Sequence, residues 1–554
     1  MDTFEEKKGT LKKIIQKDGI LTSDKHLIIS TRGNESKGGW IFDLRNVFMN
    51  PASLDLIADI FWKKFSSLYP FQVGGQEIAA IPLVTAILLK GQTLGKPTNG
   101  FIIRKNRKPT GLQRIVEGEL NSERIILVDD LMNSGTAIFR QLKVLEEIDR
   151  KADLVFVLVN FREKTNSERV AEKDLKLDFL FTLKDFGLNN APTNVLPKQN
   201  FDIIWKFKSP HPNLFNRVPK STPCLDKDKL YFGSDCDYFW ALSQNDGSII
   251  WKFEVGLARA FRKSILSSPV LFGDLVYFGA YDGNVYALNK NTGKVRWKYE
   301  EADYVGSSPA VAPDLNLLFI GLEFGLFRKQ GGIAALDLKT GKEVWKYAME
   351  EYVHSSPVYC PEKGTVAIGC NDFCVYLFDA KNGRLKWKYK TKGPIKASFS
   401  FDTARNLLIF GSFDKNIYAL DLDSGKLKGK FETKEVIFST PKSYGDYVYF
   451  SSADKNIYCL SLVTGRLIWK FTTGGRSFSS PEIIEGKVIV GSNDGRAYEL
   501  DAKTGKCLSF FQTTERITNP IAYNPQTKRY FVTTYANEIY CLQKKSATGL
   551  EQTR

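Results

Sequence analysis

The sequence predicts a multidomain protein in which an α/β domain is followed by an all-β eight-bladed propeller. Helix-like and strand-like segments alternate over residues 1–185, which is typical of a mainly parallel sheet. Over residues 201–543, three sequence markers each recur eight times, which is typical of a repeat architecture. Residues 186–200 are rich in Asn and Pro and predict a linker. Residues 544–554 follow the last repeat as a C-terminal tail.

The first domain is predicted from the spacing of its apolar residues. Residues 51–68 form an amphipathic pattern that begins with Pro, a residue favoured in the first turn of a helix. Residues 124–129 and 153–160 are almost entirely apolar, as expected of buried parallel strands. The predicted helices are 3–17, 51–68, 80–89 and 135–150, and the predicted strands are 100–104, 124–129 and 153–160.

The second domain is predicted from its repeats, whose first marker is a Trp-Lys-aromatic triplet spaced by 40–48 residues. This marker, or its equivalent, lies at Trp205, Trp251, Trp297, Trp345, Trp387, Gly429, Trp469 and Ser509. A Ser-Ser-Pro-like site lies at Pro223, Pro269, Pro309, Pro357, Phe399, Pro441, Pro481 and Pro520. A Val-Tyr-Ala-Leu-Asp-like site lies at Trp240, Tyr286, Ala334, Tyr376, Tyr418, Tyr458, Tyr498 and Tyr540.

Each repeat contains about four short strands with alternating polarity, separated by Gly, Asp and Asn turns, which is typical of a propeller blade. The eighth repeat has no Trp-containing strand after its last marker. Conversely, residues 202–207 precede the first Ser-Ser-Pro-like site and have no blade of their own. We therefore expect this N-terminal strand to complete the last blade and close the ring, which would leave no open sheet edge.

The repeated motifs TGKVRW and TGRLIW resemble those of the pyrroloquinoline quinone (PQQ)-like family of eight-bladed propellers. Quinoprotein dehydrogenases of that family have a vicinal cysteine pair, and this sequence has none. PQQ is therefore not expected as a cofactor, although a quinoprotein dehydrogenase stays open as a third function. The resemblance implies an interaction or sensing scaffold with an unidentified protein partner. Cys459 and Cys541 occupy the Ala position of the third marker and are expected in the core.

Composition and the distribution of apolar residues indicate where the protein is found and which kinds of site it lacks. The N-terminal segment carries charges of both signs and no apolar stretch of the kind found in secretory signals. The longest apolar run, residues 78–89, is too short to span a membrane. Eight cysteines in such a chain favour a reducing compartment. The sequence thus predicts a soluble, cytoplasmic protein without membrane contact, and its three histidines make a histidine metal cage or a His dyad a poor candidate.

The net charge of +16 leaves two interpretations open. Nucleic-acid binding would use basic residues to neutralise phosphates, but no zinc-finger spacing or RNA-binding aromatic motif accompanies the charge. Alternatively, the lysines occupy solvated strand and turn positions, and a nucleic-acid partner is not expected. One dense cluster, residues 104–108, has four cations in five residues and needs a local explanation.

Polar chemistry in the first domain is concentrated in residues 125–137, IILVDDLMNSGTA. An apolar strand ends in Asp129 and Asp130, and small residues then lead into a helix. The N–H groups of a helix N-terminus suit a phosphate monoester, and two carboxylates suit ribose hydroxyls or a cation. The alternative is an ordinary strand, turn and helix cap. Two other segments favour a site: Gly74–Glu77, which could form a second anion-binding turn, and the cationic residues 102–118.

These segments together resemble the type I phosphoribosyltransferases, specifically the orotate phosphoribosyltransferase branch. VDDLMNSGTA resembles the motif for 5-phosphoribosyl 1-pyrophosphate (PRPP), RKNRKPTGLQRIVEG the catalytic loop, and GGQEIAAIPLVTA the pyrophosphate loop. The resemblance implies transfer of phosphoribose from PRPP to a base such as orotate, and a homodimer formed through this domain. It implies Mg²⁺ as cofactor, bound through PRPP rather than by a direct side-chain cage. The implied catalytic residues are Lys108, Asp129 and Asp130. The implied PRPP-binding residues are Gly74, Gly75, Arg104, Lys105, Lys108, Asp129, Asp130, Asn133, Ser134, Gly135 and Thr136, and Arg162 is the implied base-binding residue.

The sequence departs from the family pattern at three positions. Asn106 replaces an acid in the loop, Thr110 replaces a His or Tyr, and Phe161 replaces the Asp before Arg162. An alternative function therefore stays open, in which the domain binds PRPP or a nucleotide without turnover. In that case the bound state would be signalled through a protein-binding propeller.

Overall fold

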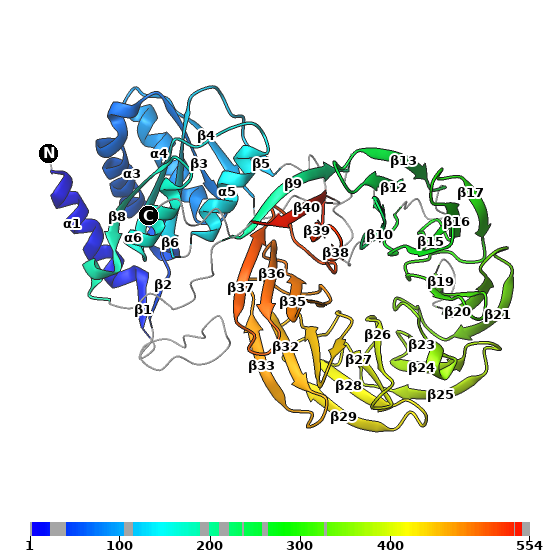
Figure 1. Cartoon of the computed structure of the whole chain (residues 1–554). Coiled ribbons are helices and arrows are strands. Elements are labelled where there is room, and N and C mark those ends of the chain that lie inside the picture. Colours follow the sequence, from blue (N-terminus) through cyan, green and yellow to red (C-terminus); the bar gives the residue numbers. More distant parts are fainter. Residues whose placement is uncertain are drawn as a thin grey trace. The chain divides into compact units, whose positions relative to one another are not determined.

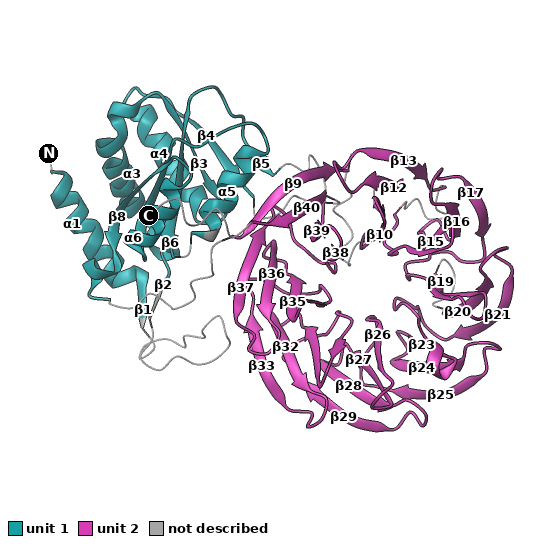
Figure 2. Ribbon diagram, viewed as in Figure 1, with its two compact units in different colours: residues 1–196 teal, residues 197–554 magenta. Residues whose placement is uncertain are grey.

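The computed structural model describes residues 3–22, 40–104, 115–133, 135–188, 199–209, 221–234, 238–256, 264–325, 330–536 and 538–545. The chain divides into two compact units, residues 1–196 and 197–554 (Figure 2). None of the helices in the described ranges is both long enough and apolar enough to cross a membrane.

The first unit is built on a six-stranded sheet in the order β5-β4-β3-β6-β7-β8 (Figure 1). All neighbouring pairs are parallel except β4 and β5, which are antiparallel. The strands are β3 (Phe71–Gln76), β4 (Asn99–Ile103), β5 (Val116–Glu117), β6 (Arg124–Met132), β7 (Leu154–Asn160) and β8 (Lys176–Thr182). A separate two-stranded sheet pairs β1 (Ile20–Thr22) with β2 (Trp40–Phe42).

Apolar side chains cover both faces of the six-stranded sheet. Because side chains alternate along a strand, Ile126 and Val128 of β6 pack into one core, and Ile125 and Leu127 pack into the other. Helices α1, α3 and α4 contribute to the first core, and α5 and α6 contribute to the second. The helices are α1 (Phe4–Ile14), α2 (Arg45–Phe48), α3 (Pro51–Phe65), α4 (Ala80–Thr93), α5 (Thr136–Glu146) and α6 (Glu163–Ala171), with shorter helical turns η1 (Ile15–Gly19), η2 (Ser66–Leu68) and η3 (Leu183–Phe186).

The second unit contains eight four-stranded antiparallel sheets arranged as a ring (Figure 1). The eight-bladed propeller predicted from the repeats is therefore confirmed. The first four sheets are β10 (Cys224–Asp226), β11 (Lys229–Gly233), β12 (Tyr238–Ser243), β13 (Ile249–Glu254); β14 (Val270–Phe272), β15 (Leu275–Gly279), β16 (Val285–Asn289), β17 (Val295–Tyr299); β18 (Ala310–Ala312), β19 (Leu317–Phe324), β20 (Gln330–Asp337), β21 (Glu343–Met349); and β22 (Val358–Cys360), β23 (Thr365–Gly369), β24 (Cys374–Asp379), β25 (Leu385–Lys390), with η4 (Pro361–Lys363) between β22 and β23.

The remaining four sheets follow the same plan. They are β26 (Phe399–Asp402), β27 (Leu407–Gly411), β28 (Asn416–Asp421), β29 (Leu427–Glu432); β30 (Lys442–Tyr444), β31 (Tyr447–Ser451), β32 (Asn456–Ser461), β33 (Leu467–Thr472); β34 (Glu482–Ile484), β35 (Lys487–Gly491), β36 (Arg496–Asp501), β37 (Cys507–Gln512); and β38 (Ala522–Asn524), β39 (Arg529–Thr533), β40 (Glu538–Lys544), β9 (Phe201–Lys208). In the eighth sheet, β9 pairs antiparallel with β40, with Trp205 opposite Cys541. Cys459 and Cys541 are fully buried, as expected.

Tryptophan side chains connect successive sheets of the propeller. Trp297 of β17 donates its Nε1–H to the carbonyl oxygen of Leu338 in the next sheet at 3.0 Å. Its ring also covers Gly341, where a Cβ atom would lie only 2.5 Å from the indole. Equivalent hydrogen bonds run from Trp205, Trp251, Trp345, Trp387 and Trp469. The recurring tryptophan thus contributes to the contact between blades, which explains its spacing in the sequence.

Candidate functional site

Several strands of the first unit end at one edge of the sheet. Because β3, β4, β6 and β7 are parallel, their carboxyl ends carry polar residues to that edge, which is where open α/β sheets bind ligands. Asp129 and Asp130 lie on β6. The sequence predicted that the strand ends at these acids, but β6 continues to Met132, and Asp129 pairs with Val157 of β7. Asp129 is therefore part of the packed sheet, with 6% of its surface exposed.

The two adjacent carboxylates accept hydrogen bonds from the backbone that follows them. The N–H of Asp130 donates to Oδ1 of Asp129 at 3.0 Å, and the N–H of Leu131 donates to Oδ1 of Asp130 at 2.8 Å. Burial raises the pKa of Asp130, hydrogen bonds with Asp129 and the backbone oppose this rise, and the negative charge of Asp43 adds to it. A ligand that brings hydroxyl donors or a cation would relieve this crowding of negative charge.

The segment after β6 leads into the N-terminus of α5. Gly135 is the residue before the helix and adopts φ +74°, a left-handed conformation that favours glycine. A Cβ atom there would lie 2.7 Å from the side chains of Met132 and Phe139. The first N–H groups of a helix have no partner within the helix, so this end of α5 can hold an anion. Ser134 and the side chain of Thr136 lie outside the described residues.

Arg162 lies directly before α6 and contacts the same segment. Its Nε–H donates to Oδ1 of Asn133 at 3.0 Å, and its backbone N–H donates to Oδ1 of Asn160 at 3.2 Å. The structure therefore brings Arg162 next to the loop that follows the acid pair. The arginine predicted to bind the base thus lies beside the segment predicted to hold the phosphate.

Asn160 and Asn166 were not predicted from the sequence, yet both position this site. Each is fully buried. The Asn166 amide donates to the carbonyl oxygens of Met132 and Asn133, both at 3.1 Å, and to Oδ1 of Asn160 at 2.7 Å. Asn166 thus ties the end of β6 to the end of β7. Asn160 could have been noticed as the polar residue at the end of the apolar strand 154–160. Asn166 lies on α6, whose polar sequence gave no helical pattern, and this helix was not predicted.

Gly74 and Gly75 do not form the predicted turn. Both lie inside β3, which is buried along its whole length, and the turn before α4 falls at residues 77–79. At Gly74 a Cβ atom would lie 2.1 Å from the ring of Phe101, and at Gly75 it would lie 2.4 Å from the carbonyl oxygen of Val128. These glycines let neighbouring elements pack closely, so the prediction of a glycine turn is wrong.

The cationic cluster is described only at its first residue. Arg104 follows β4 and contacts two acids, with 3.8 Å to a carboxylate oxygen of Glu77 and 3.5 Å to one of Glu117. Gly118 lies beyond the loop with φ +97°. Lys105, Asn106, Lys108 and Thr110 lie outside the described residues, so their predicted roles stay predictions.

The described acids do not form a metal cage. Among the residues that the structure describes, no group of three or more His, Cys, Asp or Glu side chains is arranged to hold a metal ion. Asp129 and Asp130 nevertheless offer carboxylate oxygens, the ligand type that Mg²⁺ prefers when substrate phosphates and water complete its shell. The donor set fits an ion that is bound together with a phosphorylated substrate.

Curated proteins resemble the first unit. Orotate phosphoribosyltransferase of Pyrococcus abyssi is 32% identical over 164 residues, which cover 29% of this chain and 85% of the relative. The enzyme of Pyrococcus furiosus is 32% identical over 155 residues, covering 27% of this chain and 80% of the relative. The chain belongs to the orotate phosphoribosyltransferase family. The family's Aquifex aeolicus member is 26% identical over 176 residues, covering 32% of this chain and 94% of that protein. The first unit is thus a phosphoribosyltransferase-type domain.

Other comparisons match the second unit of this orotate phosphoribosyltransferase family member. Residues 202–352 match a family model described as outer membrane protein assembly factor BamB, and residues 328–553 match one described as beta-alanine-activating enzyme, beta-propeller. BamB from Moraxella catarrhalis has a similar structure, with a TM-score of 0.51 and 18% identity, covering 62% of this chain and 98% of that one. Quinohemoprotein alcohol dehydrogenase ADHIIG from Pseudomonas putida HK5 reaches a TM-score of 0.52 at 14% identity, covering 63% and 78%. At these identities the likeness concerns the PQQ-like propeller fold alone.

Proposed function

We propose that the first unit transfers phosphoribose from PRPP to a nitrogen base such as orotate, forming a pyrimidine nucleotide 5′-monophosphate and pyrophosphate. The observation that carries the proposal is the continuous run from the acid pair on β6 through Asn133 to the N-terminus of α5, with Arg162 bonded to Asn133. In the proposed reaction this run would supply groups for the ribose, the 5′-phosphate and the base.

PRPP binding would use the two ends of this run differently. The 5′-phosphate would accept hydrogen bonds from the N–H groups of residues 133–136, where the positive end of the α5 dipole favours an anion. The ribose hydroxyls would donate to Asp129 and Asp130, and burial together with the charge of Asp43 disfavours the ionised form of Asp130 in the absence of a ligand. Hydroxyl groups that donate to these carboxylates would stabilise their ionised form. Binding of the ribose would therefore also offset the crowding of negative charge at the acid pair.

Loss of pyrophosphate places positive charge on the ribose and negative charge on the leaving group, so the main task of the protein is electrostatic stabilisation. Mg²⁺, held by Asp129 and Asp130 together with substrate oxygens, would neutralise part of this charge. Arg104 is already shared between Glu77 and Glu117. The cations for the departing pyrophosphate would be Lys105 and Lys108, as the family resemblance implies.

The base would bind beside Arg162. Asn133 holds the Nε–H of this arginine, and its guanidinium has further N–H donors that suit a carboxylate. Phe161 precedes Arg162 and packs against Phe42 of β2 with 5.3 Å between ring centroids. Phe161 occupies the position where the family has an acid. Together with Phe42 it would give a planar base an apolar surface to contact.

A second candidate function follows from Asn106, Thr110 and Phe161, the three departures from the family pattern. A first unit that keeps the acid pair and the N-terminus of α5 but has an altered catalytic loop would bind PRPP without turnover. The propeller would then bind a protein partner in a way that depends on whether PRPP is bound. The third candidate, a quinoprotein dehydrogenase, has only the propeller fold in its favour.

We also propose that the protein works in the cytoplasm as a homodimer formed through the first unit. Seven cysteines in the described ranges are free thiols, which suits a reducing compartment. The dimer would let the loop 104–118 reach the site of a neighbouring subunit, as the family resemblance implies. Sedimentation velocity of the intact chain measures the oligomeric state.

Pyrophosphate release tests the proposed function. The intact chain is mixed with PRPP, Mg²⁺ and, in turn, orotate, uracil, adenine and hypoxanthine, and PRPP binding is measured by calorimetry in parallel. We expect release that depends on orotate or a closely similar pyrimidine. Binding of PRPP without release from any base would favour the sensor, and neither binding nor release would contradict both. Quinone absorbance of the purified protein tests the third candidate.

A further inference from the structure

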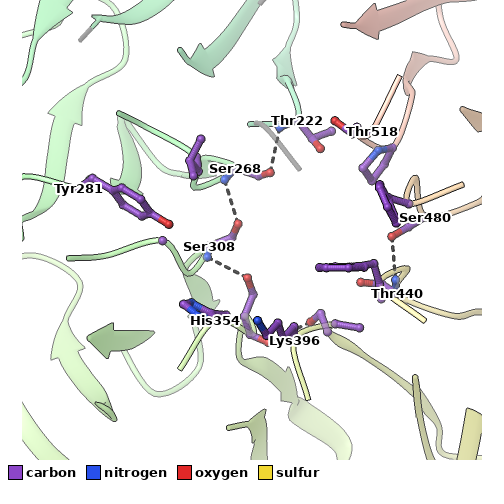
Figure 3. Close-up of a pocket in the computed structure, with 17 residues that line it drawn as sticks. Thr222, Ser268, Tyr281, Ser308, His354, Lys396, Thr440, Ser480 and Thr518 are labelled. Atoms are coloured by element: carbon purple, nitrogen blue, oxygen red, sulfur yellow. Dashed lines mark hydrogen bonds between the residues drawn. The ribbon is translucent and has the colours of Figure 1, made fainter. Parts of the chain in front are cut away.

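The centre of the propeller contains a cavity of about 260 Å³ (Figure 3). All eight sheets contribute to its wall, mostly through the Ser-Ser-Pro-like sites that precede their innermost strands. Hydroxyl residues dominate this wall, and Lys396, His354 and Tyr281 also line it. Phe438 and Phe478 form an apolar side next to the lysine, with their rings 5.0 Å apart.

The wall hydroxyls form a circumferential set of hydrogen bonds. Each serine of the set accepts a backbone N–H from the preceding sheet, and the dashed lines in Figure 3 mark this arrangement. The bonds run from Thr222 to Ser268 at 2.9 Å, from Ser268 to Ser308 at 2.9 Å, from Ser308 to Ser356 at 2.8 Å and from Thr440 to Ser480 at 2.8 Å.

These bonds determine what the serine hydroxyls can offer a ligand. A hydroxyl has one proton to donate, and each Oγ of the set already accepts an N–H. Within the part of the chain that the structure describes, Ser268, Ser308, Ser356 and Ser480 have no protein acceptor for that proton. The four serines thus present hydrogen-bond donors to the cavity, and their natural partners are acceptor oxygens.

Lys396 adds a positive charge to the same wall. The side chain is half-buried, and within the described ranges no carboxylate lies within ion-pair distance of its ammonium group. Its Nζ lies over the ring of Phe413, 4.9 Å from the ring centroid. Burial lowers the pKa of Lys396, and the charge of Glu323 only partly opposes this effect. An ammonium that is desolvated without an ion pair gains free energy from an anion in the cavity.

One carboxylate near the cavity has its own partner. Glu323 is almost fully buried, and its Oε2 lies 3.2 Å from Nδ1 of His354. This contact orients the His354 ring and occupies one oxygen of the acid. The other oxygen, Oε1, is buried without a hydrogen-bond partner among the described residues. Lys396 and the four serine donors are left for a ligand.

We propose that the central cavity of the propeller binds a small oxyanion, a phosphate or a carboxylate, with Lys396 as its ion partner and the serine hydroxyls as hydrogen-bond donors. The cavity is slightly smaller than the roughly 300 Å³ at which sites for drug-sized ligands begin. The ligand is therefore small, and the side formed by Phe438 and Phe478 accepts any apolar part that it carries.

Calorimetry on the full chain tests this proposal with inorganic phosphate, pyrophosphate and benzoate as probes. Lys396→Met removes the charge but keeps the length of the side chain, and Lys392→Met removes an exposed lysine of the same connection. We expect at least one probe to bind at least tenfold more weakly to K396M than to the wild type, with no change in K392M. The first unit is the same in all three proteins, so any phosphate bound there does not affect the difference. Equal affinity in K396M and the wild type for every probe would overturn the proposal.

Chemical labelling gives a second readout that needs no variant. Acetic anhydride acetylates neutral amines, and mass spectrometry of a digest reports the labelling of Lys396 and Lys392 separately. We expect a saturating probe to slow acetylation of Lys396 severalfold and to leave Lys392 unchanged. Protection by phosphate or by benzoate identifies which oxyanion the cavity prefers. Unchanged labelling of Lys396 with all three probes would contradict the proposal.

Discussion

At the scale of single residues, the acid pair on β6 can be changed without disturbing the sheet. Asp129→Asn together with Asp130→Asn keeps Oδ1 atoms that can accept the N–H groups of residues 130 and 131, but it removes both charges. We expect turnover to fall by orders of magnitude, since the ribose hydroxyls and the cation lose their partners. Steady-state kinetics measures the loss, and circular dichroism checks the fold. Wild-type activity in the folded double variant would exclude these residues from the site.

Asp43 affects the same pair through its charge. Burial raises the pKa of Asp130 and Asp43 raises it further, so protonation begins at a higher pH than for an ordinary aspartate, whose pKa is about 3.9. Because the ionised form would accept the ribose hydroxyls in the proposed reaction, we expect kcat/KM to fall as pH drops through this raised value. Asp43→Asn removes one negative charge, lowers the pKa of Asp130 and moves the acid limb of the profile to lower pH. The exposed Asp174→Asn serves as the control, and an acid limb that moves equally in both variants would contradict this role.

At the scale of elements, two sheets of the propeller lack the connecting tryptophan. Ser509 replaces it in β37, and the eighth sheet has no turn for a tryptophan to cover, because β9 comes from the other end of the unit. Instead, Ser509 donates to Glu499 at 2.5 Å, and Lys544 of β40 lies 2.6 Å from the same carboxylate. Gly429 replaces tryptophan in β29, and a Cβ atom at Gly429 or at Gly465 of the next sheet would meet no atom within 4 Å.

This difference predicts opposite effects of two substitutions. Trp297→Ala removes a buried ring and its hydrogen bond, so we expect the free energy of unfolding of the second unit to fall by about 3 kcal/mol. Gly429→Trp places a ring over Gly465, and burial of its apolar surface should add roughly 1 kcal/mol. Urea unfolding of the two variants and the wild type measures both changes. A loss of stability in G429W as large as that in W297A would show that the space over Gly465 cannot hold the ring.

Strand β9 predicts a second effect at this scale. It pairs with β40, Lys206 lies 3.2 Å from the buried carboxylate of Glu538, and Trp205 donates to Gln244 of the first sheet at 2.9 Å. A propeller that begins at Pro210 loses all three interactions and exposes the edge of β40. We expect it to be less soluble and to unfold at a lower temperature than one that begins at Asn200. Equal solubility and equal melting temperature would contradict closure of the ring by this strand.

At the scale of the whole molecule, the sequence predicts the features that repeat or alternate. The spacing of 40–48 residues identifies the blades because each blade buries the same positions. The alternation of apolar strands and helices identifies the α/β unit in the same way. Strand β3 was missed because Phe71–Gln76 contains two glycines and two glutamines, a composition that disfavours strands. The close packing of Gly74 against Phe101 and of Gly75 against Val128 explains why glycines occupy these positions of a strand that pairs with both β4 and β6.

As with the fold, the sequence predicted one part of the candidate site and missed another. Asp129, Asp130, Asn133 and Gly135 form one stretch of sequence, so their common position follows from a single motif. Asn160 and Asn166 reach the site from other elements, and their role depends on hydrogen bonds that no local pattern reveals, from Asn166 to Met132 and Asn133 and from Arg162 and Asn166 to Asn160. The cavity of the propeller was not predicted either, because its wall is assembled from eight distant segments.

We propose that this chain uses PRPP as a substrate, and that its densest cationic cluster serves the leaving pyrophosphate rather than a nucleic acid. Lys108→Ala tests both parts in one measurement of nucleotide formation from PRPP and orotate, with RNA and DNA affinity measured alongside. We expect the wild type to form the nucleotide, and K108A to lose most of its kcat because charge develops on pyrophosphate in the transition state, with unchanged nucleic-acid affinity. No nucleotide from any base, or full activity in K108A together with weaker nucleic-acid binding and a shallower salt dependence, would contradict the account.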